Sequence, residues 1–154
     1  MPVDEASTVA CAAFIVAPTV PVVIDNCGNI LTPSAPVISA TPICNGTETY
    51  TYTYPDCKAN THDWVYTYTI YNTIAPTGTA PANLSFQCIE DVPPANINDV
   101  TNASSNCNGI LNIKVSDTNN GGSGCTQNPY IVTRTYTLTD CGGLSTNLVQ
   151  IITV

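Results

Sequence analysis

Two stretches of the chain alternate strictly between two kinds of side chain. Residues 47–54 place four threonines on one face and Glu48 with three tyrosines on the other. Residues 64–70 do the same, with Trp64, two tyrosines and Ile70 on one side. Because successive side chains of a strand point to opposite faces, the two runs predict a long hairpin with its aromatic face in a core.

Further strands are expected along most of the chain. The second half has matching runs at about 130–139 and 147–154, and the apolar stretch from Phe14 to Ile24 also suggests strands interrupted by prolines. Turn residues separate these runs at Asn45-Gly46, Asn108-Gly109 and 120–124. No amphipathic helix of useful length is visible. Short strands with frequent turns are typical of an all-β sandwich.

The two halves of the sequence repeat one another. Residues 51–57 (TYTYPDC) align with residues 135–141 (TYTLTDC), and Asn26-Cys27 aligns with Asn106-Cys107. We therefore expect two tandem immunoglobulin-like β-sandwich modules, at 1–74 and 83–154. The segment 75–82 contains two prolines and is predicted to be a short, semi-stiff linker.

Eight cysteines are spread evenly between the modules, four in each half. No two lie close enough for a C-x2-C zinc motif, so they indicate disulfides and an oxidising, extracellular or surface location. Four cysteines allow three pairings. The expected strand order favours two disulfides in each module: Cys11–Cys44, Cys27–Cys57, Cys88–Cys125 and Cys107–Cys141.

Composition narrows the possible partners. Charged residues make up 9% of the chain, against roughly 25% in an average globular protein. The net charge is −8 with only three Lys and Arg, which argues against binding to nucleic acid or an anionic membrane surface. No apolar run is long enough to span a membrane, and no leader is recognisable. We expect a piece of a longer exported protein.

Few residues suggest chemistry. His62 is the single histidine, but His62 and Asp63 are neighbours in a strand and point to opposite faces, so we do not expect an enzyme. Trp64 is expected in the core, with an exposed sugar-stacking platform as the alternative. Calcium is the one cofactor considered, because carboxylate and amide oxygens gather in predicted loops. Its candidate ligands are Asp25, Asn26, Asp56, Asn106, Asp140 and Asp117; turn capping is the alternative role of these residues.

Three segments resemble hyalin-repeat-like (HYR-like) immunoglobulin-type modules. They are residues 25–29 (DNCGN), residues 50–57 (YTYTYPDC) and residues 62–70 (HDWVYTYTI). The second half, from Leu84 through Cys141 to Val154, looks like another variant of the family. The loops after Asp56-Cys57 and Asp140-Cys141 depart from the Gly-Asn turn common in the family. The resemblance implies arrays in giant surface proteins of Bacteroidetes, including gliding adhesins exported by the type IX secretion system, and it brings no catalytic residues.

The leading prediction is a non-catalytic adhesive or structural repeat of a long cell-surface protein. Its partners would be neighbouring modules of the same chain or identical subunits, and surface glycans are a further option. Two alternatives stay open at this stage: a subunit of a self-assembling extracellular fibre, and a carbohydrate-binding module.

Overall fold

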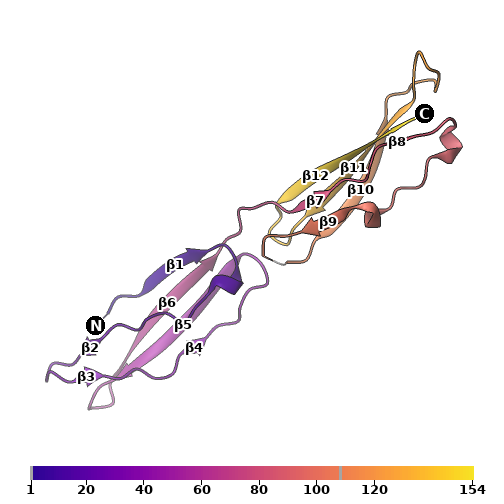
Figure 1. Ribbon diagram of the computed structural model, residues 1–154. Helices are drawn as coiled ribbons and strands as arrows, with labels where there is room; N and C mark the ends of the chain where they lie inside the picture. The colour runs from indigo at the N-terminus through magenta and orange to yellow at the C-terminus, as the bar shows by residue number, and fades with distance from the viewer. Residues whose placement is uncertain (1, 108) are drawn as a thin grey trace. The chain divides into compact units, whose positions relative to one another are not determined.

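The computed structural model describes residues 2–107 and 109–154, so Asn108 of the predicted Asn108-Gly109 turn lies outside the described residues. The chain divides into two compact units, unit 1 at Met1–Thr73 and unit 2 at Ile74–Val154. Both are built from β-strands with short 3-10 helices (Figure 1). No helix among the described residues is long and apolar enough to cross a membrane.

Unit 1 contains a four-stranded and a two-stranded sheet. The larger sheet has the order β1-β6-β5-β4, and the smaller pairs β2 with β3. The strands are β1 (Glu5–Val9), β2 (Val23–Ile24), β3 (Ile30–Leu31), β4 (Val37–Ile38), β5 (Gly46–Pro55) and β6 (Thr61–Ile70), and the 3-10 helix η1 covers Ala12–Phe14. The expected hairpin is confirmed as β5 and β6, which pair antiparallel from Gly46↔Ile70 to Pro55↔Thr61.

The stretch from Phe14 to Ile24 differs from the prediction, since only Val23 and Ile24 form a strand there. Pro18 and Pro21 each lack a backbone N–H, which prevents a continuous ladder through this segment. Most of the stretch is therefore irregular.

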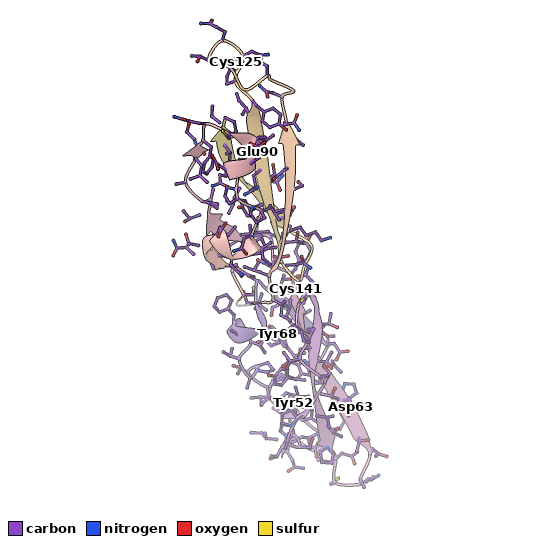
Figure 2. The ribbon with its side chains drawn as sticks, turned by 90° about the vertical axis from the view of Figure 1, so that its right-hand side faces the viewer. Tyr52, Asp63, Tyr68, Glu90, Cys125 and Cys141 are labelled. Carbon is purple, nitrogen blue, oxygen red and sulfur yellow. The ribbon has the colours of Figure 1, made fainter. Side chains whose placement is uncertain are left out.

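The core of unit 1 is aromatic, as the alternation predicted. Tyr50, Tyr52, Tyr54, Trp64 and Tyr68 are buried together with Val23 of the smaller sheet, so the two sheets share one core. The ring centroids of Tyr52 and Trp64 are 5.7 Å apart, within the range of favourable aromatic pairs. Figure 2 shows Tyr52 and Asp63 on opposite sides of the β5–β6 hairpin.

Unit 2 repeats the arrangement of the larger sheet. Its order is β10-β11-β12-β8, and a smaller sheet pairs β7 with β9. The strands are β7 (Thr77–Thr79), β8 (Leu84–Ser85), β9 (Thr101–Ser104), β10 (Asn112–Asn119), β11 (Ile131–Thr139) and β12 (Ser145–Thr153), with 3-10 helices η2 (Ile89–Asp91) and η3 (Ile97–Asp99). The predicted strands at 130–139 and 147–154 correspond to β11 and β12.

The segment expected to be a linker, 75–82, contributes a strand to unit 2. β7 pairs with β9, Pro76 is fully buried, and the Thr146 hydroxyl donates to the Pro76 carbonyl at 2.6 Å. A Cβ on Gly78 would lie 2.9 Å from Cδ2 of Leu138, so any larger residue there would have to displace this buried side chain. Buried apolar surface therefore holds this proline-containing stretch on the unit that follows it.

Candidate functional site

Two loops in unit 1 are closed by the same hydrogen bonds around an aspartate. In the β2–β3 loop, Oδ1 of Asp25 accepts from the backbone N–H groups of Cys27 and Asn29, both at 2.8 Å. The Asn29 side chain donates to Oδ2 at 3.0 Å. Gly28 has φ +86°, a left-handed conformation that suits glycine. The aspartate thus acts as an Asx-turn residue.

The β5–β6 turn has the same hydrogen bonds, although three of its five residues differ. Asp56 accepts from the N–H groups of Lys58 and Asn60 at 2.8 and 2.9 Å, and the Asn60 amide donates to Oδ2 at 2.8 Å. The left-handed position is occupied by Ala59, with φ +63°. Alanine in place of glycine there is locally strained, because its Cβ crowds the following carbonyl.

Hydrogen bonding sets the charge of both aspartates. The pKa of Asp25 and the pKa of Asp56 are lowered, chiefly by the amide side chains of Asn29 and Asn60 respectively. The negative charge of Asp25 acts in the opposite direction on the pKa of Asp56. The two loops are therefore close enough to interact, and both lie at the same end of unit 1 (Figure 1).

A third loop of this kind joins β11 to β12 in unit 2. The carboxylate of Asp140 is buried and accepts from the N–H of Leu144 at 2.9 Å, and Gly143 has φ +87°. Leu144 stands where the other two loops have asparagine. The altered loop keeps the backbone bonds of the pattern and lacks the asparagine amide donor.

The predicted calcium ligands are not brought into one cluster. Asp25 and Asp56 lie near each other, whereas Asp140 follows Thr139, the partner of Asn112 at one end of the β10–β11 pair, and Asp117 lies five residues further along β10. Asn26 is exposed, and the amide of Asn106 lies 3.9 Å from Sγ of Cys107. Within the described residues no three His, Cys, Asp or Glu side chains gather as metal ligands would.

The cysteines divide into two groups. Cys11, Cys44, Cys107 and Cys141 are disulfide-bonded, whereas Cys27, Cys57, Cys88 and Cys125 are exposed free thiols. The structure thus holds two disulfides where the sequence predicted four. The predicted pairings Cys11–Cys44 and Cys107–Cys141 each join two of the bonded cysteines, and the other two pairings are not formed. The loops around Cys27 and Cys57 keep their shape without a bridge, because each is closed by its own aspartate.

In both of the predicted disulfides that are not formed, Cys27–Cys57 and Cys88–Cys125, the two free thiols nevertheless lie in neighbouring segments. Cys27 and Cys57 belong to the two aspartate loops described above. Gln87 and Ile89, on either side of Cys88, line the same shallow hollow as Gly124, which precedes Cys125. Figure 2 shows Cys125 and Cys141 at opposite ends of unit 2.

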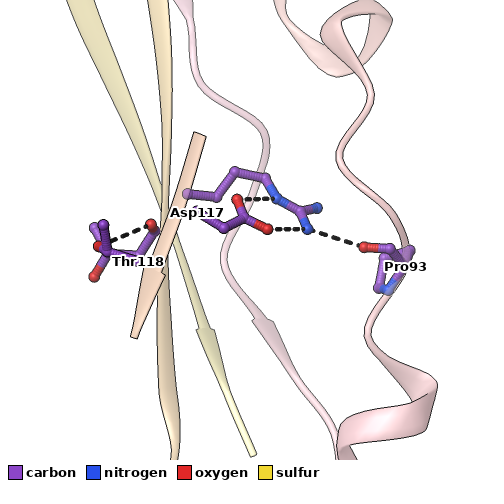
Figure 3. A network of polar contacts seen from close by, with 5 residues as sticks. Pro93, Asp117 and Thr118 are labelled. Carbon is purple, nitrogen blue, oxygen red and sulfur yellow. Dashed lines mark hydrogen bonds and ion pairs between the residues drawn. The ribbon is translucent and has the colours of Figure 1, made fainter. Parts of the chain in front are cut away.

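A buried ion pair in unit 2 was not expected from the sequence. Arg134 is 2% exposed, and its Nε and Nη2 donate to the two carboxylate oxygens of Asp117 at 2.9 and 2.8 Å. Nη2 also donates to the carbonyl of Pro93 at 3.0 Å (Figure 3). The pKa of Arg134 is raised, mainly by its hydrogen bonds to Asp117. A signal existed in the alternation of β11, which places Arg134 on the same face as Val132, Tyr136 and Leu138.

The residues considered for catalysis or sugar binding lie in β6, where Asp63 and Trp64 make structural hydrogen bonds. His62 is the second residue of β6 and faces Tyr54 in the register. Asp63 accepts a hydrogen bond from the Thr53 hydroxyl at 2.6 Å. Trp64 is fully buried and its indole N–H donates to the Val3 carbonyl at 2.9 Å. Trp64 is therefore a core residue, as predicted, and offers no exposed platform.

Comparison with known proteins supports the resemblance for the first half. Residues 1–70 match a family model described as an HYR-like domain with 4 cysteines. The match covers nearly all of unit 1 and includes Cys11, Cys27, Cys44 and Cys57. A search of curated proteins found no match to the chain. The match over residues 1–70 and the two disulfides are consistent with a structural repeat module outside the cell.

Proposed function

We propose that the chain is a segment of a long extracellular surface protein, a stalk or adhesin, in which tandem modules bear tension. Both units would be HYR-like immunoglobulin-type sandwiches, and the protein would have no enzymatic activity. In line with the resemblance, the parent would be a surface protein of Bacteroidetes exported by the type IX system.

The observation that supports a load-bearing role is the direction of the end strands. In unit 1 the first strand, β1, runs parallel to the last, β6, from Glu5↔Tyr66 to Val9↔Ile70. In unit 2 the first strand of the larger sheet, β8, runs parallel to β12. Parallel end strands mean that the chain enters a unit at one end and leaves at the other. Tension along the chain then shears all the hydrogen bonds of the pair together.

The likeness of the two units supports a repeat. The larger sheet of each unit has the same strand order, β1-β6-β5-β4 in unit 1 and β8-β12-β11-β10 in unit 2, when strands that align in the internal repeat are compared. Each unit also has a second, two-stranded sheet. The hairpins β5–β6 and β11–β12 turn through equivalent aspartate loops at Asp56 and Asp140. The nearest partners would then be modules of the same chain.

The proposed function predicts a strong dependence on pulling direction. The chain would be pulled in a single-molecule experiment from its two ends, and separately through handles at Thr47 and Thr69, register partners at the open end of the β5–β6 hairpin. End-to-end pulling shears β1 from β6, whereas the hairpin handles unzip one residue pair at a time. We expect a clearly higher rupture force end to end. Equal forces in the two geometries would contradict the proposal.

Measuring the size of the particles in solution distinguishes the proposed repeat from the main alternative, a subunit of a self-assembling fibre. A fibre subunit would use an edge strand to recruit another copy. β10 is an edge strand of eight residues, but it has Lys114 near its middle, a charge that disfavours edge-to-edge pairing. We expect monomers by light scattering and no filaments by electron microscopy. Filaments would favour the fibre, and hits on a glycan array would favour a carbohydrate-binding module.

A further inference from the structure

The two units differ in the strand pairing that tension on the chain ends would load first, which we call the joint of each unit. In unit 1 this joint is the parallel pair β1–β6, which extends over five residue pairs. It is continued at both ends by single bonds. The N–H of Val65 donates to Oδ1 of Asp4 at 2.9 Å, and the N–H of Tyr71 donates to the Val9 carbonyl at 2.9 Å.

The corresponding joint in unit 2 is much shorter. β8 and β12 pair over two residues, Ile152↔Leu84 and Thr153↔Ser85. The N–H of Phe86 adds a bond to the Thr153 carbonyl at 2.9 Å. Before β8 the chain passes through β7, which pairs with β9 over a short, irregular register, Thr77↔Ser104 and Thr79↔Thr101. Between β7 and β8 two side chains hold it: Gln150 donates to the Ala82 carbonyl at 2.6 Å, and Asn83 accepts from the N–H of Ile151 at 2.8 Å. The chain that enters unit 2 is therefore held by two short pairs, which can separate one after the other, whereas unit 1 has a single pair of five residues.

The cysteine behind each joint also differs. Cys11 follows β1 by two residues, is buried and is disulfide-bonded. Its equivalent, Cys88, follows β8 by three residues and is an exposed free thiol. A chain peeled from unit 1 reaches a covalent crosslink directly after β1. While Cys88 is a free thiol, a chain peeled from unit 2 meets no crosslink before Cys107, the first bonded cysteine of that unit.

We propose that unit 2 is the element that yields under tension and that unit 1 is the element that holds. This inference rests on the proposed load-bearing function. As force rises, β7 separates from β9 and β8 from β12 first, and the segment from Ile74 to Cys107 is drawn out. Its departure also removes the Pro93 carbonyl from Arg134. Unit 1 stays closed until the five-pair β1–β6 joint shears at a higher force.

The test is a single-molecule pulling experiment on the full chain, held at its two ends. Two rupture events are expected, and removal of one disulfide assigns each event to a unit. In the Cys107→Ser/Cys141→Ser variant, the predicted pairing Cys107–Cys141 no longer shields the residues between them, so the lower-force event should lengthen by ~110–120 Å at ~3.3–3.6 Å per residue. The matched variant Cys11→Ser/Cys44→Ser should lengthen the higher-force event by a similar amount.

A proline pair tests the cause without touching a cysteine. The Val9 carbonyl accepts from β6, so by alternation the backbone groups of Ser7 also face β6 and those of Thr8 face away. Ser7→Pro removes a donor from the middle of the joint, whereas Thr8→Pro removes one that β6 does not use. We expect Ser7→Pro to lower the rupture force of the higher-force event alone, and Thr8→Pro to leave that force nearly unchanged.

The outcomes distinguish this inference from the proposed function. If the lower-force event lengthens in the Cys11→Ser/Cys44→Ser variant, unit 1 yields first and the inference is wrong, although the load-bearing role survives. The inference is also wrong, and the load-bearing role also survives, if Ser7→Pro lowers the rupture force of the lower-force event. If both events occur at forces no higher than hairpin unzipping, the load-bearing function itself fails. Should a cysteine variant not fold, the proline pair still identifies the event of unit 1.

Discussion

The guanidinium of Arg134 is held by both carboxylate oxygens of Asp117 on the neighbouring strand, and Arg134 is itself buried in unit 2. The equivalent position in unit 1 is Tyr50, a core aromatic. The two units thus fill the same place in the sheet in different ways. In unit 2 the ion pair also attaches the segment around Pro93 to the sheet, because Nη2 of Arg134 donates a further hydrogen bond to the Pro93 carbonyl.

Asp117→Asn should destabilise unit 2. Removing one partner of a buried ion pair leaves an uncompensated charge, which costs about 3–5 kcal/mol when both groups are fully buried. Asp117 is 37% exposed, so water reaches it and we expect a loss of about 2 kcal/mol in the free energy of unfolding. Denaturant unfolding followed by circular dichroism measures this loss. Lys114→Gln on the same strand is the control and should change little.

Glu48→Val should stabilise unit 1. Glu48 is 4% exposed, and its Oε2 is buried without a hydrogen-bond partner. The equivalent residue of unit 2 is Val132, which is buried in the same way. Replacing the buried carboxylate by an apolar side chain should raise the free energy of unfolding by about 1–2 kcal/mol. Fluorescence of Trp64, the single tryptophan, reports on unit 1 alone. A lower stability would show instead that the carboxylate stabilises the unit.

Ala59→Gly should also stabilise unit 1. Ala59 has φ +63° at the position that Gly28 and Gly143 occupy in the other two aspartate loops. Glycine removes the steric cost of the left-handed conformation, roughly 1–2 kcal/mol, but loses more entropy on folding. The expected net gain is about 0.5–1 kcal/mol in thermal or denaturant unfolding followed by Trp64. The reverse change, Gly28→Ala, should destabilise the unit; a gain there would refute the explanation.

Acid should weaken unit 1 through its two aspartate loops. The pKa values of Asp25 and Asp56 are lowered in the folded state by hydrogen bonds to Asn29 and Asn60. A lowered carboxyl pKa contributes stability above the unfolded pKa, and that contribution is lost as the pH falls through the folded pKa. The melting temperature of unit 1 should therefore fall as the pH is lowered below about 4. Asp25→Asn/Asp56→Asn should flatten this part of the pH profile.

Mild oxidation should consume the four free thiols in two specific pairs. Cys27 and Cys57 lie in adjacent loops, and the neighbours of Cys88 and Cys125 share a hollow. We expect peptide mapping after oxidation to find Cys27–Cys57 and Cys88–Cys125 bonds. Closing two further loops should raise the stability of both units by about 3 kcal/mol or less each, depending on strain. Crosslinks between molecules, or other pairings, would contradict the predicted framework.

The alternation of side chains was enough to predict the hairpins. In β5 and β6 the period of two brings Tyr50, Tyr52, Tyr54, Trp64 and Tyr68 to one face, and burial of aromatic surface leaves little choice of register. The repeat of four cysteines likewise predicted two units. The aspartate loops were recognised as sites of interest, but only their hydrogen bonds show that Asp25 and Asp56 serve to close turns.

Local pattern by itself thus determined the long hairpin strands and their core face, because these depend on residues close in sequence, and the internal repeat determined the two-unit plan. Tertiary structure decided what depends on residues distant in sequence. Pro76 and Gly78 fit against Leu138, so the expected linker became a strand of unit 2. Arg134 could be buried only because Asp117 and Pro93 meet it there. Such encounters are set by packing between segments, which no local pattern records.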